Sequence, residues 1–132
     1  MTTTFEKLAE SAKQVAFQHG DLCHFELPIQ DLARAKQFYG EVFGWQFHDV
    51  PEMNYTMFLT PGGKLGGGFF APDANQSDRV VNYMSVNSID ETVTKIEALG
   101  GKLVGPKVEI PGHGTMQHLT DSEGTLIALW QA

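Results

Sequence analysis

The feature that most constrains this chain is an internal repeat of strand-like segments around a helical one. Two helical patterns end in glycine, at Gly44 and at Gly100-Gly101, and Gly44 aligns with Gly101 at a spacing of 57 residues. The same spacing aligns Asp31 with Ser88, and both residue types cap helix N-termini by accepting hydrogen bonds from first-turn amides. The order strand, helix, three strands therefore occurs twice, which predicts an α+β fold built from two tandem βαβββ units.

Period-two and helical patterns, separated by turn residues, give the expected bounds of each element. The first unit covers residues 21–72 and the second covers 80–131. The expected strands are 22–28, 45–50, 55–60, 64–71, 80–86, 102–109, 115–120 and 125–131, and the expected helices are 31–43 and 89–99. No linker separates the units, so residues 1–132 are predicted to form one domain with a curved mixed sheet. Four strands cannot bury their concave face alone, so the units are expected to pair within the chain or across a homodimer.

Residues 4–18 repeat apolar side chains at helical spacing and predict an added N-terminal amphipathic helix. Thr3 and Glu6 match a capping box at its start, and Gly20 follows its end. Glu6 and Glu10 interrupt the stretch and no small-residue cleavage site follows, which disfavours a targeting segment. The helix is expected to pack on the domain or on a second subunit.

Several short motifs occur in one fixed order along the two units. They are His24-Phe25-Glu26-Leu27, Asp31-Leu32, Phe38-Tyr39, Phe43-Gly44-Trp45, Ala98-Leu99-Gly100-Gly101 and Asp121-Ser122-Glu123-Gly124-Thr125. In this order the chain resembles the vicinal oxygen chelate superfamily, which includes glyoxalase I, bleomycin-resistance proteins and extradiol dioxygenases. The resemblance covers residues 21–131, and the stretch 55–69 is similar to the glyoxalase-like branch. It implies that the two units form a cup that holds a small molecule.

In metal-dependent members of that superfamily, four side chains hold a divalent ion that binds vicinal oxygens of the substrate. Carried onto this chain, the four ligand positions fall on His24, Gly67, Val81 and Ala128. A shift of one residue in register would bring in Glu26, Asn82 or Tyr83. Only His24 of the first four has a donor side chain, and one ligand does not hold a catalytic ion. We therefore expect no firmly bound cofactor and at most a weakly held divalent metal on His24.

Polar side chains on the predicted concave face are the candidate catalytic groups. Alternation places His24 and Glu26 on one face of their strand and Cys23 on the other. His118 lies three residues before Asp121, where similar extradiol enzymes place a pocket-facing polar group. We expect His24, Glu26 and His118 to converge in one cavity. The expected lining residues of that cavity are Phe69, Tyr83, Ala128 and Trp130.

A His–Glu pair in a partly apolar pocket suits abstraction of a proton beside a carbonyl group. Burial raises the pKa of a carboxylate and so makes it a stronger base, and an imidazole ordinarily titrates near neutral pH. Under the alternative interpretation, Glu26 and His118 are solvated or mutually hydrogen-bonded structural groups. Cys23 is expected to be a buried small apolar residue rather than a nucleophile.

Composition excludes several classes of function. The formal net charge of −7 and the sequence pI near 5.0 disfavour nucleic acid and anionic membrane surfaces as partners. The single cysteine excludes an internal disulfide framework and indicates a reducing compartment such as the cytoplasm. The longest apolar runs are too short to span a bilayer.

Three functions stay open at this point. The first is a lyase- or isomerase-type enzyme acting on a small oxygenated metabolite. The second is a metal-free protein of bleomycin-resistance type that binds an aromatic or cationic ligand in an acidic groove lined by aromatic side chains. The aromatic side chains that suit such a groove are Trp45, Tyr55, Phe69 and Trp130. The third is a structural or regulatory module whose cup is a vestige.

Overall fold

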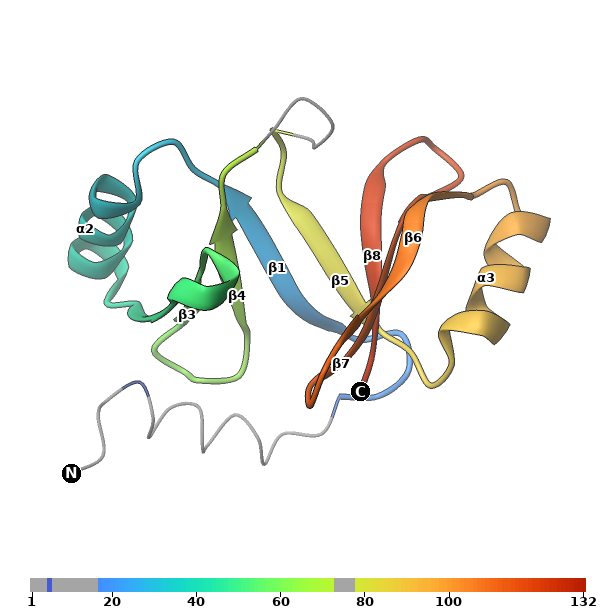
Figure 1. Cartoon of the computed structure of the whole chain (residues 1–132), viewed down its shortest axis with the longest axis horizontal. Helices are drawn as coiled ribbons and strands as arrows, with labels where there is room; N and C mark the ends of the chain where they lie inside the picture. The colour runs from blue at the N-terminus through green and yellow to red at the C-terminus, as the bar shows by residue number, and fades with distance from the viewer. Residues whose placement is uncertain (1–4, 6–16, 73–77) are drawn as a thin grey trace. The chain divides into compact units, whose positions relative to one another are not determined.

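The structure, a computed structural model, describes residues 5, 17–72 and 78–132. These residues form eight strands, two α-helices and one 3-10 helix (Figure 1). The elements are β1 (Leu22–Pro28), α2 (Leu32–Phe43), β2 (Gln46–Val50), η1 (Pro51–Met53), β3 (Tyr55–Leu59), β4 (Gly66–Phe70), β5 (Val81–Ser85), α3 (Ile89–Ala98), β6 (Lys102–Ile110), β7 (Gly114–Thr120) and β8 (Leu126–Gln131). The helix expected over residues 4–18 falls almost entirely outside the described residues, and Phe17 and Gln18 are not helical.

The chain divides into two compact units. Among the described residues from 17 onward, unit 1 comprises His24–Val80, and unit 2 comprises Phe17–Cys23 with Val81–Ala132. The strand order is β2-β3-β4-β1 in unit 1 and β6-β7-β8-β5 in unit 2. The β1–β4 and β5–β8 pairs are parallel, and the other pairs within each unit are antiparallel. The predicted α+β fold with two βαβββ units and mixed strand pairing is confirmed.

In unit 1, helix α2 covers one face of the strands through aromatic side chains. The Asp31 carboxylate accepts a hydrogen bond from a first-turn amide at 3.0 Å, and Gly44 ends the helix at φ 75°. Tyr39 of α2 stacks on Trp45 at 4.6 Å between ring centroids, and Trp45 stacks on Phe58 at the same distance. Phe58 is only 1% exposed, so this layer is the core of unit 1. We call the covered side the helix face of unit 1 and the opposite side its site face.

In unit 2, helix α3 covers one face of its own strands. Ser88 caps the helix, since its Oγ accepts a hydrogen bond from the Glu91 amide at 3.2 Å. Beneath the helix lies a compact cluster of buried apolar side chains. Its members are Val86, Ile89, Leu119 and Leu129. The two cores are therefore chemically different: aromatic stacking in unit 1 and aliphatic packing in unit 2.

Candidate functional site

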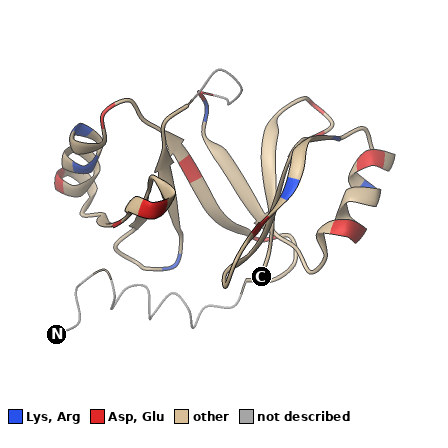
Figure 2. Ribbon diagram, in the orientation of Figure 1, with Lys and Arg blue, Asp and Glu red and all other residues tan. Residues whose placement is uncertain are grey.

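Strand β1 carries a histidine and a glutamate on the site face of unit 1. His24 pairs with Gly66 and Glu26 pairs with Gly68 in the parallel β1–β4 ladder, so both side chains stand over glycines. The Nε2 atom of His24 lies 3.9 Å from Oε2 of Glu26, and the two side chains are 29% and 16% exposed. Glu26 is the acidic residue on the β1 ribbon in Figure 2. The pair is therefore shielded from bulk water but still accessible from it.

A third polar group joins this pair from strand β3. The hydroxyl of Tyr55 lies 2.9 Å from Nε2 of His24, within hydrogen-bond distance. Alternation along β3 places Tyr55 and Met57 on one face, and Met57 pairs with Gly68. The site face of unit 1 thus brings together an imidazole, a carboxylate and a phenol.

Glycines in β4 make room for these side chains. A Cβ atom built on Gly68 would overlap the Tyr55 ring and its hydroxyl, with the oxygen as the nearest atom. On Gly67 a Cβ would meet the Phe25 carbonyl and the ring of Phe58, so Gly67 faces the helix face. The expected ligand position at Gly67 is therefore corrected: the site-face positions of β4 are Gly66 and Gly68.

Unit 2 carries the remaining candidate residues on its sheet face opposite α3. In the β5–β8–β7 register, Ala128 pairs with both Tyr83 and His118, and Trp130 pairs with Met116. The rings of Tyr83 and His118 have centroids 6.1 Å apart and meet edge to face. Tyr83, His118, Ala128 and Trp130 thus share one face within unit 2. The convergence of His118 with His24 and Glu26 stays a prediction.

Two aromatic residues lie elsewhere than the sequence pattern suggested. Phe69 is 2% exposed and packs against Tyr39 and Phe58 on the helix face of unit 1, so it does not line a pocket with His24. Its place follows from the register, because Phe69 is one residue beyond Gly68 and alternate residues face opposite sides. Trp45 is half-buried and stacks on Tyr39 and Phe58 on the same face. Both rings therefore lie on the helix face of unit 1 rather than beside His24, and a groove lined by aromatic side chains stays a prediction.

The side chains at the four metal-ligand positions implied by the resemblance offer few donor atoms. Val81, Ala128 and the β4 glycines have no donor atoms in their side chains, which leaves His24. Among residues 5, 17–72 and 78–132, no three His, Cys, Asp or Glu side chains come close enough together to hold a metal ion. The donor set therefore does not fit the four-ligand ion of the metal-dependent relatives.

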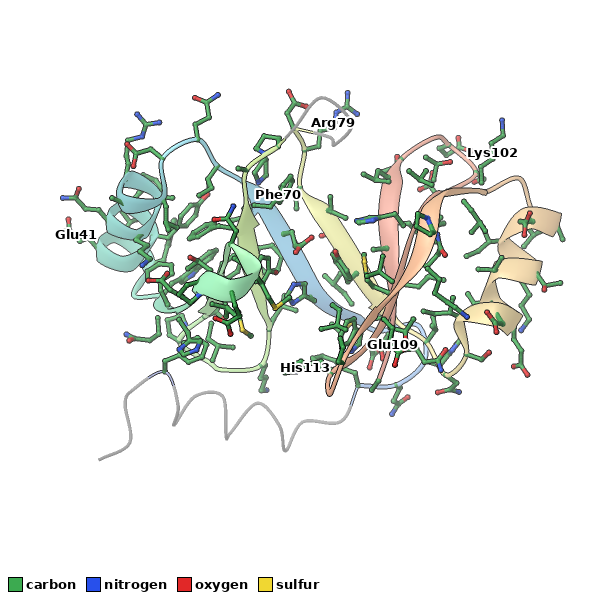
Figure 3. The ribbon with its side chains drawn as sticks, in the orientation of Figure 1. Glu41, Phe70, Arg79, Lys102, Glu109 and His113 are labelled. Atoms are coloured by element: carbon green, nitrogen blue, oxygen red, sulfur yellow. The ribbon has the colours of Figure 1, made fainter. Side chains whose placement is uncertain are left out.

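Cys23 and His113, two other residues with potentially reactive side chains, make hydrogen bonds that support the local structure. The Sγ of Cys23 donates to the carbonyl oxygen of Tyr83 at 3.6 Å, and burial raises the pKa of this thiol to about 11. At neutral pH the thiol keeps its proton, as expected for a structural cysteine. His113 lies in the β6–β7 turn (Figure 3), where its backbone amide donates to the Ile110 carbonyl.

A surface groove of about 530 Å³ lies in unit 1 where β1 leads into α2. Its walls include Ile29, Arg34 and Phe38, with the Asp31 and Asp78 side chains at the same site. Neither His24 nor Glu26 lines this groove. The groove is thus a feature distinct from the polar cluster on the site face.

The residue that sequence reasoning missed as a member of the cluster is Tyr55. The only available signal was the run Gly66-Gly67-Gly68, because consecutive glycines in a strand indicate close approach by another group. That run did not identify the approaching group as the Tyr55 phenol.

Comparison with known proteins shows which family model and which proteins the chain is similar to. A family model described as "Bleomycin resistance protein-like N-terminal" matches residues 22–61. Over 127 residues the chain is 28% identical to CFP32 of Mycobacterium tuberculosis, which is provisionally named a glyoxylase, covering 91% of this chain and 49% of that protein. It is 26% identical to a glyoxylase-like domain-containing protein of Didymella fabae, covering 84% of this chain and 93% of the relative. The resemblance to this superfamily is confirmed.

Solved structures share the fold. Methylmalonyl-CoA epimerase of Mycobacterium tuberculosis superimposes with a TM-score of 0.67 at 16% identity, over 92% of this chain and 94% of that one. A glyoxalase/bleomycin resistance/dioxygenase superfamily member of Vibrio splendidus gives a TM-score of 0.60 at 14% identity, over 85% and 97% of the two chains. At these identities the likeness concerns the fold. The chain spans about half the length of CFP32. None of the described helices is long and apolar enough to cross a membrane.

Proposed function

We propose that this protein is a glyoxalase-like enzyme of isomerase or lyase type that moves a proton on a small carbonyl compound. The observation that carries the proposal is the pair on β1, in which His24 Nε2 lies 3.9 Å from Glu26 Oε2 with both side chains partly shielded. A carboxylate beside an imidazole is a common acid–base arrangement, because the two groups differ in their affinity for a proton. The methylmalonyl-CoA epimerase neighbours support an isomerase, although they resemble this chain in fold alone.

In the proposed reaction Glu26 is the base. Its carboxylate takes a proton from the carbon next to a carbonyl group, and the C–H electron pair moves to give an enolate and a neutral Glu26. His24 donates a hydrogen bond to the enolate oxygen, where negative charge develops. Glu26 then returns the proton to the opposite face of the same carbon, after the enolate has turned over in the site, and this inverts that centre. With a 2-hydroxycarbonyl compound the intermediate is an enediolate, and Glu26 returns the proton to the neighbouring carbon while the hydroxyl proton moves to the oxygen of the former carbonyl group. Protons and electrons balance over these steps without an added oxidant or metal ion.

The proposal is tested by hydrogen exchange with solvent. The protein is incubated in D₂O with a panel of small 2-oxo and 2-hydroxycarbonyl compounds, and the loss of the α-proton signal is followed by ¹H NMR. We expect exchange above the buffer rate for at least one compound. Glu26→Gln should reduce this exchange by about 100-fold or more, in line with the usual contribution of a general base. If no compound exchanges faster with protein than in buffer, the proposed reaction is refuted.

A matched control comes from the same unit. Glu41 projects from α2 (Figure 3) and is exposed, so Glu41→Gln makes the same change in charge away from the site face. This variant should exchange at the wild-type rate. His118→Gln, measured beside it, tests whether the third residue expected from the sequence takes part in proton transfer.

The second candidate is a binding protein that holds a small ligand without chemistry. It is favoured by the bleomycin-resistance family model over residues 22–61 and by the net charge of −7, which suits a cationic ligand. A ligand that raises the melting temperature of both wild type and Glu26→Gln, with no exchange in either, would establish this function instead. At about 100 times its dissociation constant such a ligand adds roughly 2.7 kcal/mol of stability.

We further infer a homodimer in the cytoplasm that binds neither nucleic acid nor membrane. Exposed apolar side chains on α2 support self-association: Phe38 is 53% exposed, Val42 is 57% exposed and Phe43 is 53% exposed. The free Cys23 is in keeping with a reducing compartment. Light scattering after gel filtration tests the dimer, and a monomer at micromolar concentration would refute it.

A further inference from the structure

We propose that Tyr55 is a positioning residue that fixes the tautomer of His24. Its hydroxyl donates to Nε2 of His24, so that the neutral imidazole carries its proton on Nδ1. This assignment deepens the proposed function and rests on it, because it makes Nδ1–H the donor nitrogen of His24 in that reaction.

The first support is geometric. Nε2 of His24 lies 2.9 Å from the Tyr55 hydroxyl but 3.9 Å from the Glu26 carboxylate, and a separation of 3.9 Å is beyond hydrogen-bond distance. Of these two groups, the phenol is the one within hydrogen-bond distance of Nε2. A phenol is the better donor and a neutral imidazole nitrogen the better acceptor, so the shared proton belongs to the oxygen.

The second support is the fixed place of the phenol. The Tyr55 ring occupies the space that a side chain on Gly68 would take, since a Cβ there would overlap the hydroxyl oxygen, Cζ and Cε2 of the ring. Glycine in a strand interior weakens the strand, so its presence here has a local reason. A strand without a side chain at position 68 gives Tyr55 a backbone surface to lie on, and that surface restrains the hydroxyl near His24.

The consequence concerns the roles of the two ring nitrogens. The hydrogen bond that one nitrogen of a histidine makes determines where the other nitrogen carries its proton. With Nε2 engaged as an acceptor, this nitrogen is not the proton-accepting group of the pair, and that role falls to Glu26. Ligation of a metal through Nε2 would likewise require the Tyr55 bond to break.

The test is ¹⁵N NMR of the histidine side chains at a pH where the imidazoles are neutral. The wild-type spectrum should show His24 mainly with its proton on Nδ1, with the resonance assigned by its absence in His24→Gln. Tyr55→Phe removes only the hydroxyl and should raise the share of His24 in the Nε2–H form, the tautomer that a neutral imidazole prefers in water. A wild-type His24 already in the Nε2–H form, or a ratio unchanged in Tyr55→Phe, would overturn the proposal.

Two further variants separate positioning from general structural damage. Tyr39→Phe removes a phenolic oxygen on the helix face and should leave the His24 tautomer unchanged, whereas an equal shift in this variant would count against Tyr55. Gly68→Ala keeps the hydroxyl but displaces the ring, and should shift the tautomer in the same direction as Tyr55→Phe. Since no substrate is used, failure here would leave the proposed reaction standing, and failure of the exchange assay would leave the tautomer result standing.

Discussion

The close approach of Tyr55 to Gly68 predicts that adding one methyl group at position 68 destabilises the fold. A Cβ at position 68 would overlap the Tyr55 oxygen. Ordinary contacts between heavy atoms are near 3.5 Å, so the ring must move by about 2 Å in Gly68→Ala. Forced repacking of this kind costs about 1–3 kcal/mol.

Two smaller effects act in opposite directions on the same variant. Displacing the phenol breaks its hydrogen bond to His24, which contributes about 1 kcal/mol. Alanine is better than glycine in a strand interior by about 0.5–1 kcal/mol, which offsets that loss. The expected net destabilisation therefore stays at about 1–3 kcal/mol, measured as the change in free energy of unfolding from urea titration followed by tryptophan fluorescence.

Two further measurements test this packing argument: the control variant Gly62→Ala, and Gly68→Ala made in a protein that already carries Tyr55→Ala. Gly62→Ala places its Cβ where no atom lies within 4 Å, so its stability should stay within about 0.5 kcal/mol of wild type. In a Tyr55→Ala background the obstacle is gone, and adding Gly68→Ala should then raise the stability by about 0.5–1 kcal/mol, the usual advantage of alanine over glycine in a strand. An equal penalty with and without the Tyr55 ring would refute the packing argument.

Three further predictions concern other groups. Hydrogen bonds from Lys36 and Thr56 lower the pKa of Asp49, so the folded state favours the ionised carboxylate. The stabilisation that follows from this lowered pKa is present at neutral pH and is lost as the pH falls below about 4. Urea midpoints measured across this pH range should therefore fall less steeply in Asp49→Asn than in the wild type. Ser88→Ala should lower the free energy of unfolding by about 1 kcal/mol in thermal melts, because it removes the hydrogen-bonded cap of α3. With its thiol pKa raised to about 11, Cys23 should react with iodoacetamide at pH 8 roughly 100-fold more slowly than a free thiol, and a rate that levels off near pH 9 would contradict this.

Local signals in the sequence account for the elements of the fold. Asp31 and Ser88 were expected to cap α2 and α3, and both side chains accept first-turn amide hydrogen bonds. Gly44 was expected to end α2 and adopts the left-handed conformation there. These features depend on residues within four positions of one another, so a single stretch of sequence contains the information. The 3-10 helix η1 was not expected, since its three residues are too few to show a period.

The relation between strands is harder to infer from the sequence. His24 and Glu26 lie on the same strand two residues apart, so alternation alone places them on one face. Phe69 lies on another strand, and its face depends on how β4 aligns with β1. A shift of one residue in that alignment exchanges the two faces of the whole strand. Period-two reasoning therefore holds within a strand, but it could not decide on which side of the sheet Phe69 lies.

The same physics explains why the cluster's third member was missed. A glycine has no side chain, so the pattern of side chains along the sequence gives no information about positions 66–68. In the structure the Tyr55 ring packs on the backbone of Gly68. The glycines that make β4 look like a weak strand in the sequence thus leave room for the Tyr55 hydroxyl to lie 2.9 Å from Nε2 of His24. If this reasoning is right, a residue larger than glycine at position 68 displaces the phenol from His24 unless position 55 carries a smaller residue. The pair, rather than either residue alone, is then the unit that determines the chemistry of His24.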